Sequence, residues 1–141
     1  MQFFIANDHA GLTLKPSVME ILMRMEHQVI DLGSNGNARV DYPDIANLLC
    51  QNVLENAGSF GVLICGSGIG MSIAANRHKG IRAALCTEPY SATMSRAHND
   101  ANVLCLGARV VGIGIVESIL QSFCAGVFEG GRHLHRIKKL Q

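Results

Sequence analysis

Residues 61–77 constrain the fold more than any other stretch, because they combine the patterns of a buried strand, a glycine-rich loop and a helix. The run Val62-Leu63-Ile64 is short, apolar and rich in β-branching, which is typical of a strand buried on both faces of a parallel sheet. Three alternating glycines follow: Gly66, Gly68 and Gly70. They allow a sharp turn with exposed amides just before a helix.

Cys65 ends this strand at the carboxyl edge, where open α/β sheets hold their ligands. Amides at a helix N-terminus favour negative charge, so the position suits a thiolate. The structural alternative is a small buried side chain, since free cysteines are among the most buried residues. The sequence leaves both interpretations of Cys65 open.

Three known loop motifs do not fit this stretch. The pattern Gly-x-Gly-x-Gly lacks the third-glycine spacing of a dinucleotide site and the Lys-Ser/Thr ending of a nucleotide P-loop. A Cys-x5-Arg phosphatase would need a guanidinium at position 71, where the chain has Met71. The loop therefore predicts an anion site of another kind.

Size and charge exclude several function classes. A chain of 141 residues is expected to form one domain, spanning residues 1–141, with a core that needs no disulfide. A net charge of +1 provides no general field for nucleic acid or a membrane surface, so a small-molecule partner is expected. No apolar run reaches the roughly 20 residues of a membrane span. Asp8 follows residues 1–6 too soon for them to serve as the apolar region of a signal peptide. We expect a cytoplasmic protein.

The cysteines are odd in number, far apart and without a Cys-x-x-Cys pair. They are Cys50, Cys65, Cys86, Cys105 and Cys124. We expect neither a disulfide framework nor a zinc site, and most of the five should fill the core in a reducing compartment.

Apolar periodicity alternates between strand and helix along the whole chain. Strands are expected at residues 2–6, 29–32, 62–64, 81–85 and 103–106. Helices are expected at residues 14–25, 41–53, 71–77, 87–97 and 115–123. This alternation predicts a doubly wound, Rossmann-like parallel sheet of about five strands in a three-layer α/β/α fold.

Polar residues gather at the ends of the expected strands. Asp8 and His9 follow the first strand, Cys65 the third and Arg109 the fifth, whereas His98 precedes the fifth. Carboxyl ends of parallel strands converge, so Asp8, His9 and Cys65 should face one crevice. His98 and Arg109 do not both fit this rule, so one of them is expected in a neighbouring subunit's site. The alternatives are structural: a helix cap for Asp8 and a satisfied ring for each lone histidine.

The C-terminal segment 129–141 is basic and has two interpretations. On a helix, Arg132 and Arg136 lie four residues apart and form one guanidinium face beside His133, suited to a phosphate dianion. Composition alone favours a solvated basic tail. The whole set of a thiol, an amide loop, an acid–base pair and paired arginines suits proton abstraction next to a carbonyl, with amides stabilising an enediolate.

These residues resemble a known family, the ribose-5-phosphate isomerase B and galactose-6-phosphate isomerase sugar-phosphate isomerases. The similarity covers nearly the whole chain. The motifs that carry it are Asn7-Asp8-His9-Ala10-Gly11, Asp41-Tyr42-Pro43, Ile64-Cys65-Gly66-Ser67-Gly68-Ile69-Gly70, Ala74-Ala75-Asn76, Gly80-Ile81-Arg82-Ala83, His98-Asn99-Asp100-Ala101-Asn102-Val103, Gly107-Ala108-Arg109-Val110 and Gly130-Gly131-Arg132-His133.

The resemblance implies an aldose–ketose isomerase that interconverts ribose 5-phosphate and ribulose 5-phosphate in the non-oxidative pentose phosphate pathway, with no metal or organic cofactor. It implies that Cys65 is the base and that His98, helped by Asp8, opens the sugar ring. The implied substrate-binding residues are Asp8, His9, Tyr42, Gly66, Ser67, Gly68, Ile69, Gly70, Asn99, Arg109, Arg132 and Arg136.

The family also implies a homodimer with sites at the subunit boundary, or a dimer of such dimers. Segment 129–141 of one subunit would dock on the partner subunit. Some members use a glutamate at the position of Met71 in place of the thiol. A methionine cannot ionise, so only the assignment of Cys65 as the base applies here. Three alternatives stay open: an isomerase of allose 6-phosphate or galactose 6-phosphate, a non-catalytic sugar-phosphate sensor, and a flavodoxin-like nucleotide module.

Overall fold

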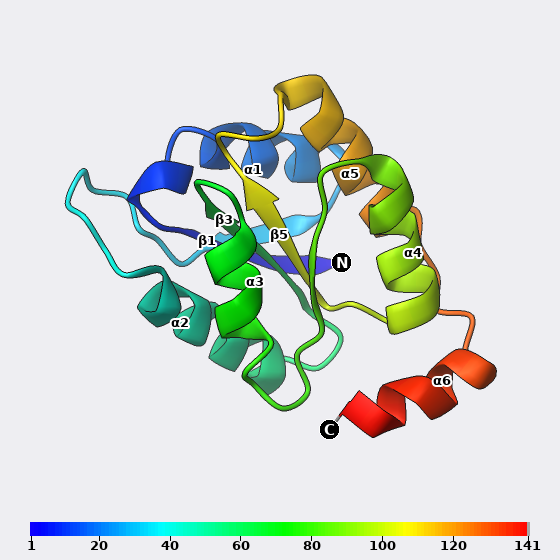
Figure 1. The fold of residues 1–141 in the computed structure, drawn as a ribbon. Helices are drawn as coiled ribbons and strands as arrows, with labels where there is room; N and C mark the ends of the chain where they lie inside the picture. The colour runs from blue at the N-terminus through cyan, green and yellow to red at the C-terminus, as the bar shows by residue number, and fades with distance from the viewer. Residues whose placement is uncertain (141) are drawn as a thin grey trace.

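Five parallel strands form the central sheet in the order β2-β1-β3-β5-β4, in a computed structural model that describes residues 1–140 (Figure 1). The strands are β1 (Gln2–Asn7), β2 (Gln28–Asp31), β3 (Phe60–Cys65), β4 (Ala83–Leu85) and β5 (Val103–Gly107). All four strand pairs are parallel. The predicted five-stranded parallel sheet is confirmed.

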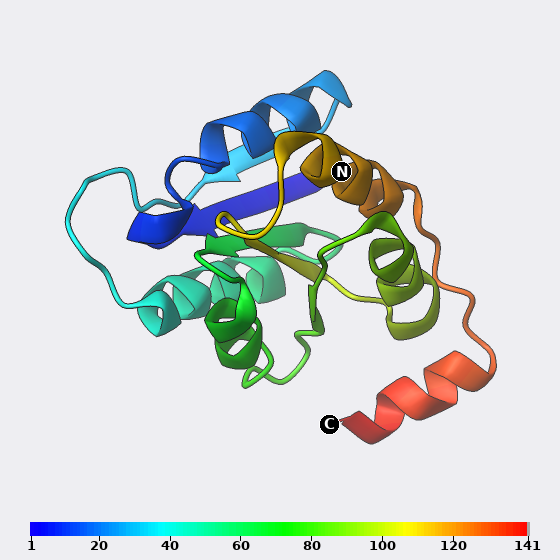
Figure 2. The same cartoon turned by 45° about the horizontal axis from the view of Figure 1, so that its top comes forward.

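Helices cover both faces of the sheet, which gives the predicted three layers. The helices are α1 (Lys15–Arg24), α2 (Tyr42–Glu55), α3 (Ile69–Ala75), α4 (Pro89–Asn99), α5 (Ile113–Ala125) and α6 (Arg132–Ile137), with 3₁₀ turns η1 (His9–Gly11) and η2 (Lys138–Leu140). Figure 2 shows α1 and α5 on one side of the sheet and α2 and α3 on the other. No helix within residues 1–140 has both the length and the apolarity needed to cross a membrane.

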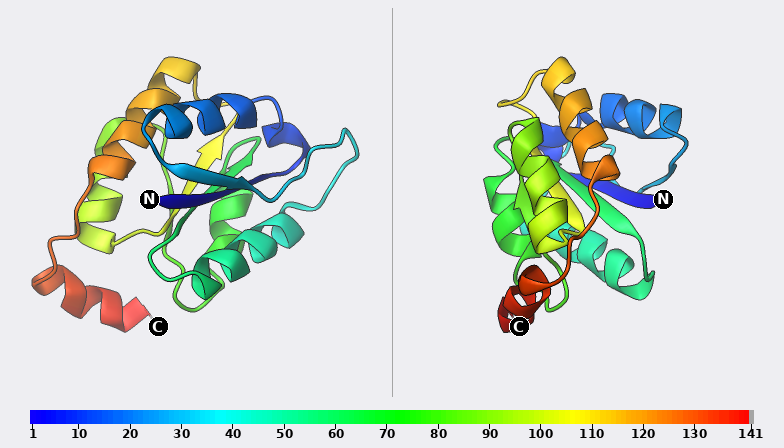
Figure 3. Two further views of the ribbon diagram at one scale, coloured as in Figure 1. Left: turned by 180° about the vertical axis from the view of Figure 1, so that it is seen from behind. Right: turned by 90° about the vertical axis from the view of Figure 1, so that its right-hand side faces the viewer.

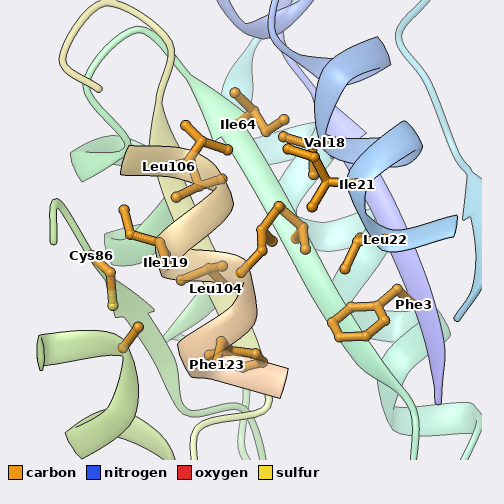
Figure 4. Packing of buried hydrophobic residues seen from close by; sticks show 14 of the residues in the cluster. Phe3, Val18, Ile21, Leu22, Ile64, Cys86, Leu104, Leu106, Ile119 and Phe123 are labelled. Atoms are coloured by element: carbon orange, nitrogen blue, oxygen red, sulfur yellow. The ribbon is translucent and has the colours of Figure 1, made fainter. Parts of the chain in front are cut away.

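Two apolar clusters join these layers. On one face, side chains of α1 and α5 pack on the sheet, with Phe3, Leu104 and Phe123 fully buried among them (Figure 4). On the other face, α2 and α3 cover Leu63 and Cys105. Met71 is fully buried in this second cluster, as expected for a side chain that supplies no charge to a site.

Local sequence explains where most helices begin. Prolines occupy the first turns of α1, α2 and α4, where no intrahelical donor is lost. The carboxylate of Glu88 caps α4 by accepting the Ser91 N–H. α3 begins two residues before the expected start at residue 71, because Gly68 turns the chain with a φ of +81°.

Strand β4 is two residues shorter than predicted, because side chains take the hydrogen bonds that a neighbouring strand would otherwise supply. The amide of Arg82 donates to the Asn102 side chain at 2.8 Å, and the amide of Ala83 donates to Asn76 at 2.8 Å. Ile81 and Arg82 therefore continue the strand pattern in the sequence but lie outside strand β4 of the sheet.

The C-terminal segment forms a helix. α6 lies beside α4 and apart from the sheet, as Figures 1 and 3 show. His133 and Ile137 are buried, whereas Arg132 and Arg136 are exposed. The helical interpretation of residues 132–137 is confirmed, and the two arginines lie one turn apart on it.

Candidate active site

A cavity of about 410 Å³ opens at the carboxyl ends of β1 and β3. The chain leaves β1 toward β2 on one side, and β3 lies on the other side, so this is the topological switch point at which open α/β sheets bind ligands. The cavity is lined by Asp8, His9, Ala10, Tyr42, Cys65, Gly66, Ser67, Gly70, Arg109 and Val110. The predicted crevice shared by Asp8, His9 and Cys65 is therefore present.

Cys65 lies at the wall of this cavity and its sulfur is hydrogen-bonded. The N–H of Gly68 donates to Cys65 Sγ over 3.1 Å. The positive φ of Gly68 folds the loop back so that its amide points at the end of β3. The loop therefore places a hydrogen-bond donor against the sulfur at the cavity wall.

The other cysteines lie in apolar surroundings and do not share this environment. Burial raises the pKa of Cys50 to about 12 and that of Cys86 to about 11, and it raises the pKa of Cys105 well above its ordinary value. Burial also raises the pKa of the half-buried Cys124 to about 11. All five cysteines are free, and these four have the structural role predicted for most of the set.

Asp8 combines a structural role with a place in the cavity wall. Its Oδ1 accepts hydrogen bonds from the amides of Ala10 at 2.9 Å and Gly11 at 3.1 Å, so the capping alternative is confirmed. These bonds fix a carboxylate that is only 7% exposed against the cavity. The cap therefore orients Asp8 and does not compete with a role in the site.

His9 is exposed, and its ring is oriented by the loop that follows β2. The Val40 N–H donates to His9 Nδ1 over 3.4 Å. A ring nitrogen that accepts a hydrogen bond carries no proton, so the neutral tautomer bears its proton on Nε2. His9 can then donate Nε2–H to an anion in the cavity.

Two glycines of the loop allow larger side chains to lie against it. A Cβ atom on Gly70 would lie 2.8 Å from the ring of Tyr42, and one on Gly66 would lie 3.3 Å from Nη1 of Arg109. The amide of Arg109 donates to the Gly66 carbonyl at 3.0 Å, which holds the segment after β5 beside the loop. The phenol and the guanidinium thus reach the same cavity as Cys65.

The structure places Arg109 with Cys65 and separates His98 from both. Because α4 runs antiparallel to the strands, its last turn lies at the amino edge of the sheet, away from the β3–α3 loop (Figure 1). A second cavity of about 270 Å³ lies there, lined by His98, Asn99, His133, Arg136, Ile137 and Leu140. The predicted site residues of one chain therefore form two separate groups.

Arg132 and Arg136 are exposed on α6 near this second cavity. Among residues 1–140, neither guanidinium forms an ion pair with a carboxylate. Within one chain they are solvated, as the tail interpretation predicted, although they lie on an ordered helix. Both guanidiniums are thus available to an anion.

Glu129 was not predicted as a site residue, and His133 was predicted only as a neighbour of the two arginines. The rings of His98 and His133 are stacked, with centroids 4.2 Å apart and planes inclined by 10°. Oε1 of Glu129 lies 3.8 Å from Nε2 of His98 and 3.6 Å from Nε2 of His133. Burial lowers the pKa of His133, and His98, Arg132 and Arg136 act in the same direction, whereas Glu129 raises it. The spacing of four residues between Glu129 and His133 was the available sequence signal.

Known proteins resemble this chain in sequence and in fold. Ribose-5-phosphate isomerase B of Escherichia coli is 44% identical over 133 residues, which are 94% of this chain and 89% of that protein. The structure of Clostridium thermocellum ribose-5-phosphate isomerase B superimposes with a TM-score of 0.96 at 45% identity, and covers 99% of this chain and 95% of that chain.

A third relative was solved with a sugar phosphate. Ribose-5-phosphate isomerase B of Mycoplasma genitalium, with bound ribulose 5-phosphate, gives a TM-score of 0.94 at 45% identity over 99% of this chain and 93% of that chain. The family model described as ribose/galactose isomerase matches residues 3–140. With residues 3–140 matched by the family model and its fold superimposing closely on these relatives, the chain belongs to the ribose/galactose isomerase family.

Proposed function

We propose that this protein is an isomerase that interconverts D-ribose 5-phosphate and D-ribulose 5-phosphate. The observation that carries the proposal is the amide of Gly68 on Cys65 Sγ, inside a cavity that also presents Asp8 and Arg109. The relatives named above are ribose-5-phosphate isomerases, one of them with the ketose phosphate bound. The chain and these relatives cover one another almost completely.

In the proposed isomerisation, Cys65 moves one proton. The thiolate takes the proton from C2 of the open-chain aldose, and the electron pair of that bond forms the C1–C2 double bond of an enediolate. Amides of the loop stabilise the oxygen that becomes negative. The proton of the C2 hydroxyl passes to the neighbouring O1. The same sulfur then returns its proton to C1 as the ketone forms at C2. Gly68 donates to the sulfur and the Ile69 N–H donates to Ser67 Oγ at 3.2 Å, so we assign the oxyanion to the other amides of the loop.

In the proposed ring opening, His98 acts as the acid and Asp8 as the base. Asp8 takes the proton of the anomeric hydroxyl, the bond from C1 to the ring oxygen breaks, and His98 gives a proton to that oxygen. A site that contains both His98 and Cys65 requires a second chain, since they lie at opposite edges of one sheet.

We therefore propose a homodimer in which segment 129–141 and α4 of one subunit dock on the cavity of the other, with a dimer of dimers as the larger assembly. Arg132 and Arg136 would then join His9 and Arg109 around the phosphate, while Tyr42 and Asn99 contact the sugar. Charge-assisted contacts from guanidinium to phosphate are among the strongest hydrogen bonds in proteins. The exposure of both α6 arginines in the isolated chain supports this assembly.

The proposed reaction belongs to the non-oxidative pentose phosphate pathway. Five free cysteines, four of them with buried thiols, fit a reducing compartment, and we place the enzyme in the cytoplasm.

The test is a turnover assay with purified protein on ribose 5-phosphate, ribulose 5-phosphate, allose 6-phosphate and galactose 6-phosphate. We expect the five-carbon pair to give the highest kcat/KM in both directions. Higher kcat/KM on a six-carbon phosphate would reassign the substrate. Binding of ribose 5-phosphate in calorimetry with no turnover would identify a sensor and refute the enzyme.

A further inference from the structure

Glu129 lies in the loop between α5 and α6, and its backbone is fixed to α4. The Glu129 N–H donates to the carbonyl of Ala97 over 3.0 Å, next to His98 in the chain. The His133 N–H in turn donates to the carbonyl of Gly130 at 3.0 Å. These two bonds hold the loop, the end of α4 and the start of α6 in one arrangement. The carboxylate of Glu129 therefore has a defined place beside both rings.

The cluster of Glu129, His98 and His133 is not arranged for a shared metal ion. A metal binds the lone pair of an imidazole nitrogen in the plane of the ring. The two rings are stacked with planes only 10° apart, so their in-plane lone pairs do not meet at one point. The arrangement suits one carboxylate that serves two imidazoles.

The two stacked rings compete for one proton, since two imidazolium ions in face-to-face contact repel each other. His133 is 6% exposed, and no hydrogen-bond partner for its Nε2 lies within residues 1–140. His98 is more open, with its side chain 38% exposed. Burial is the largest cause that lowers the pKa of His133, and it outweighs the Glu129 carboxylate, which acts in the opposite direction.

The charges on neighbouring elements do not replace Glu129. On α6, Arg132 and Arg136 are both positive and disfavour a proton on the stack. At the end of α4, the carboxylate of Asp100 is already paired with Arg96 at 2.9 Å and with Arg82 at 3.3 Å. Glu129 is therefore the carboxylate that faces the stack within residues 1–140.

We propose that Glu129 is a positioning residue that keeps the proton of the stacked pair on His98 and so presents His98 as a charged acid to the partner subunit's cavity. This inference depends on the proposed function, because it assigns Glu129 to the ring-opening step. In that step His98 gives a proton to the ring oxygen as the bond to C1 breaks, and the Glu129 carboxylate stabilises the imidazolium beforehand. His133 supports the ring of His98 and stays neutral.

The test compares Glu129→Gln with Glu117→Gln, which removes an exposed carboxylate of α5 outside both cavities. For Glu129→Gln we expect kcat on ribose 5-phosphate to fall about ten- to a hundredfold. This is less than the roughly 10² to 10⁴ for a lost general acid, because His98 itself remains. The reverse rate from ribulose 5-phosphate, which has no furanose ring to open, should stay within about twofold. The alkaline limb of the forward pH profile should move to lower pH. Glu117→Gln should match the wild type.

Proton NMR of His98 provides a readout that does not need activity. Its Hε1 titration midpoint should move to lower pH in Glu129→Gln and stay in place in Glu117→Gln. Glu129 is 54% exposed, so the variant should fold, which a thermal melt checks. Equal losses in both directions, or an unmoved titration, would overturn the inference while leaving the isomerase intact. A wild-type enzyme without isomerase activity would refute the proposed function, and the NMR result would still decide whether Glu129 controls His98.

Discussion

The N–H of Gly68 points at Cys65 Sγ over 3.1 Å, and this contact joins the glycine loop to the thiol at the end of β3. The loop therefore serves the sulfur directly as well as lining the cavity. It distinguishes Cys65 from the four other cysteines, whose pKa values burial raises.

Replacing Cys65 should abolish most turnover. With the base removed, Cys65→Ala is expected to lower kcat at least about a thousandfold, within the roughly 10² to 10⁴ that general bases contribute. Cys124→Ala, a substitution of a thiol outside both cavities, is the control and should retain activity. Iodoacetamide near pH 8 should label Cys65 and spare Cys124, whose pKa is about 11, and substrate should protect Cys65. Near-normal turnover of Cys65→Ala would refute the assignment.

Replacing His98 should affect the two directions differently. If His98 acts in ring opening, His98→Asn should be slow on ribose 5-phosphate, by roughly 10² or more, and nearly normal on ribulose 5-phosphate. Steady-state kinetics in both directions measure the ratio. His78→Asn is the matched control, because His78 bonds Asn47 on another surface and should change neither rate. Equal losses in both directions would contradict the role.

Removing one α6 arginine should weaken substrate binding. A charge-assisted contact is worth about 1.5 to 3 kcal/mol, so Arg136→Ala should raise KM roughly ten- to a hundredfold. Added salt should raise the KM of the wild type as well. Lys139→Ala removes a positive charge from η2, outside both cavities, and should change KM little. An unchanged KM in Arg136→Ala would mean that this arginine of α6 faces solvent and does not bind the phosphate.

Mixing two inactive variants tests the site at the subunit boundary. Cys65→Ala damages one half of the proposed site and Arg136→Ala the other half, so a heterodimer contains one intact site. After subunit exchange at equal amounts, activity at low substrate should recover to about a quarter of wild type, because half of the random dimers carry one good site of two. Native mass spectrometry verifies the exchange. No recovery would mean that one chain's site contains both residues.

Gly68 should not tolerate a side chain. Its φ is +81°, and a Cβ atom would lie 2.5 Å from Leu85 Cδ1 and 3.0 Å from the carbonyl carbon of Leu106. Gly68→Ala should therefore cost about 2 kcal/mol or more in the free energy of unfolding, measured by urea denaturation. Gly114→Ala is the matched control: no atom lies within 4 Å of its Cβ, and it sits in the first turn of α5. Alanine there should stabilise by about 0.5 to 1 kcal/mol, because it lowers the entropy of the unfolded chain.

Local pattern determined most of the fold. Short β-branched runs such as Val62-Leu63-Ile64 and amphipathic stripes such as that of α5 already specify alternating strands and helices, because burial of one face depends on periodicity alone. The site residues at strand ends were predictable for the same reason: carboxyl ends of parallel strands converge wherever the sheet forms, which brought Asp8, His9 and Cys65 together.

Tertiary structure decided what depends on contacts between distant segments. The sequence left open whether Arg109 or His98 accompanies Cys65, and the antiparallel course of α4 resolved it by placing His98 at the other edge of the sheet. Likewise, the spacing of Glu129 and His133 suggests that these two residues are close, but it does not indicate that the carboxylate also reaches His98. Glu129 gained its place only when its amide bonded Ala97 and the rings of His98 and His133 stacked, because these interactions join residues about 30 positions apart.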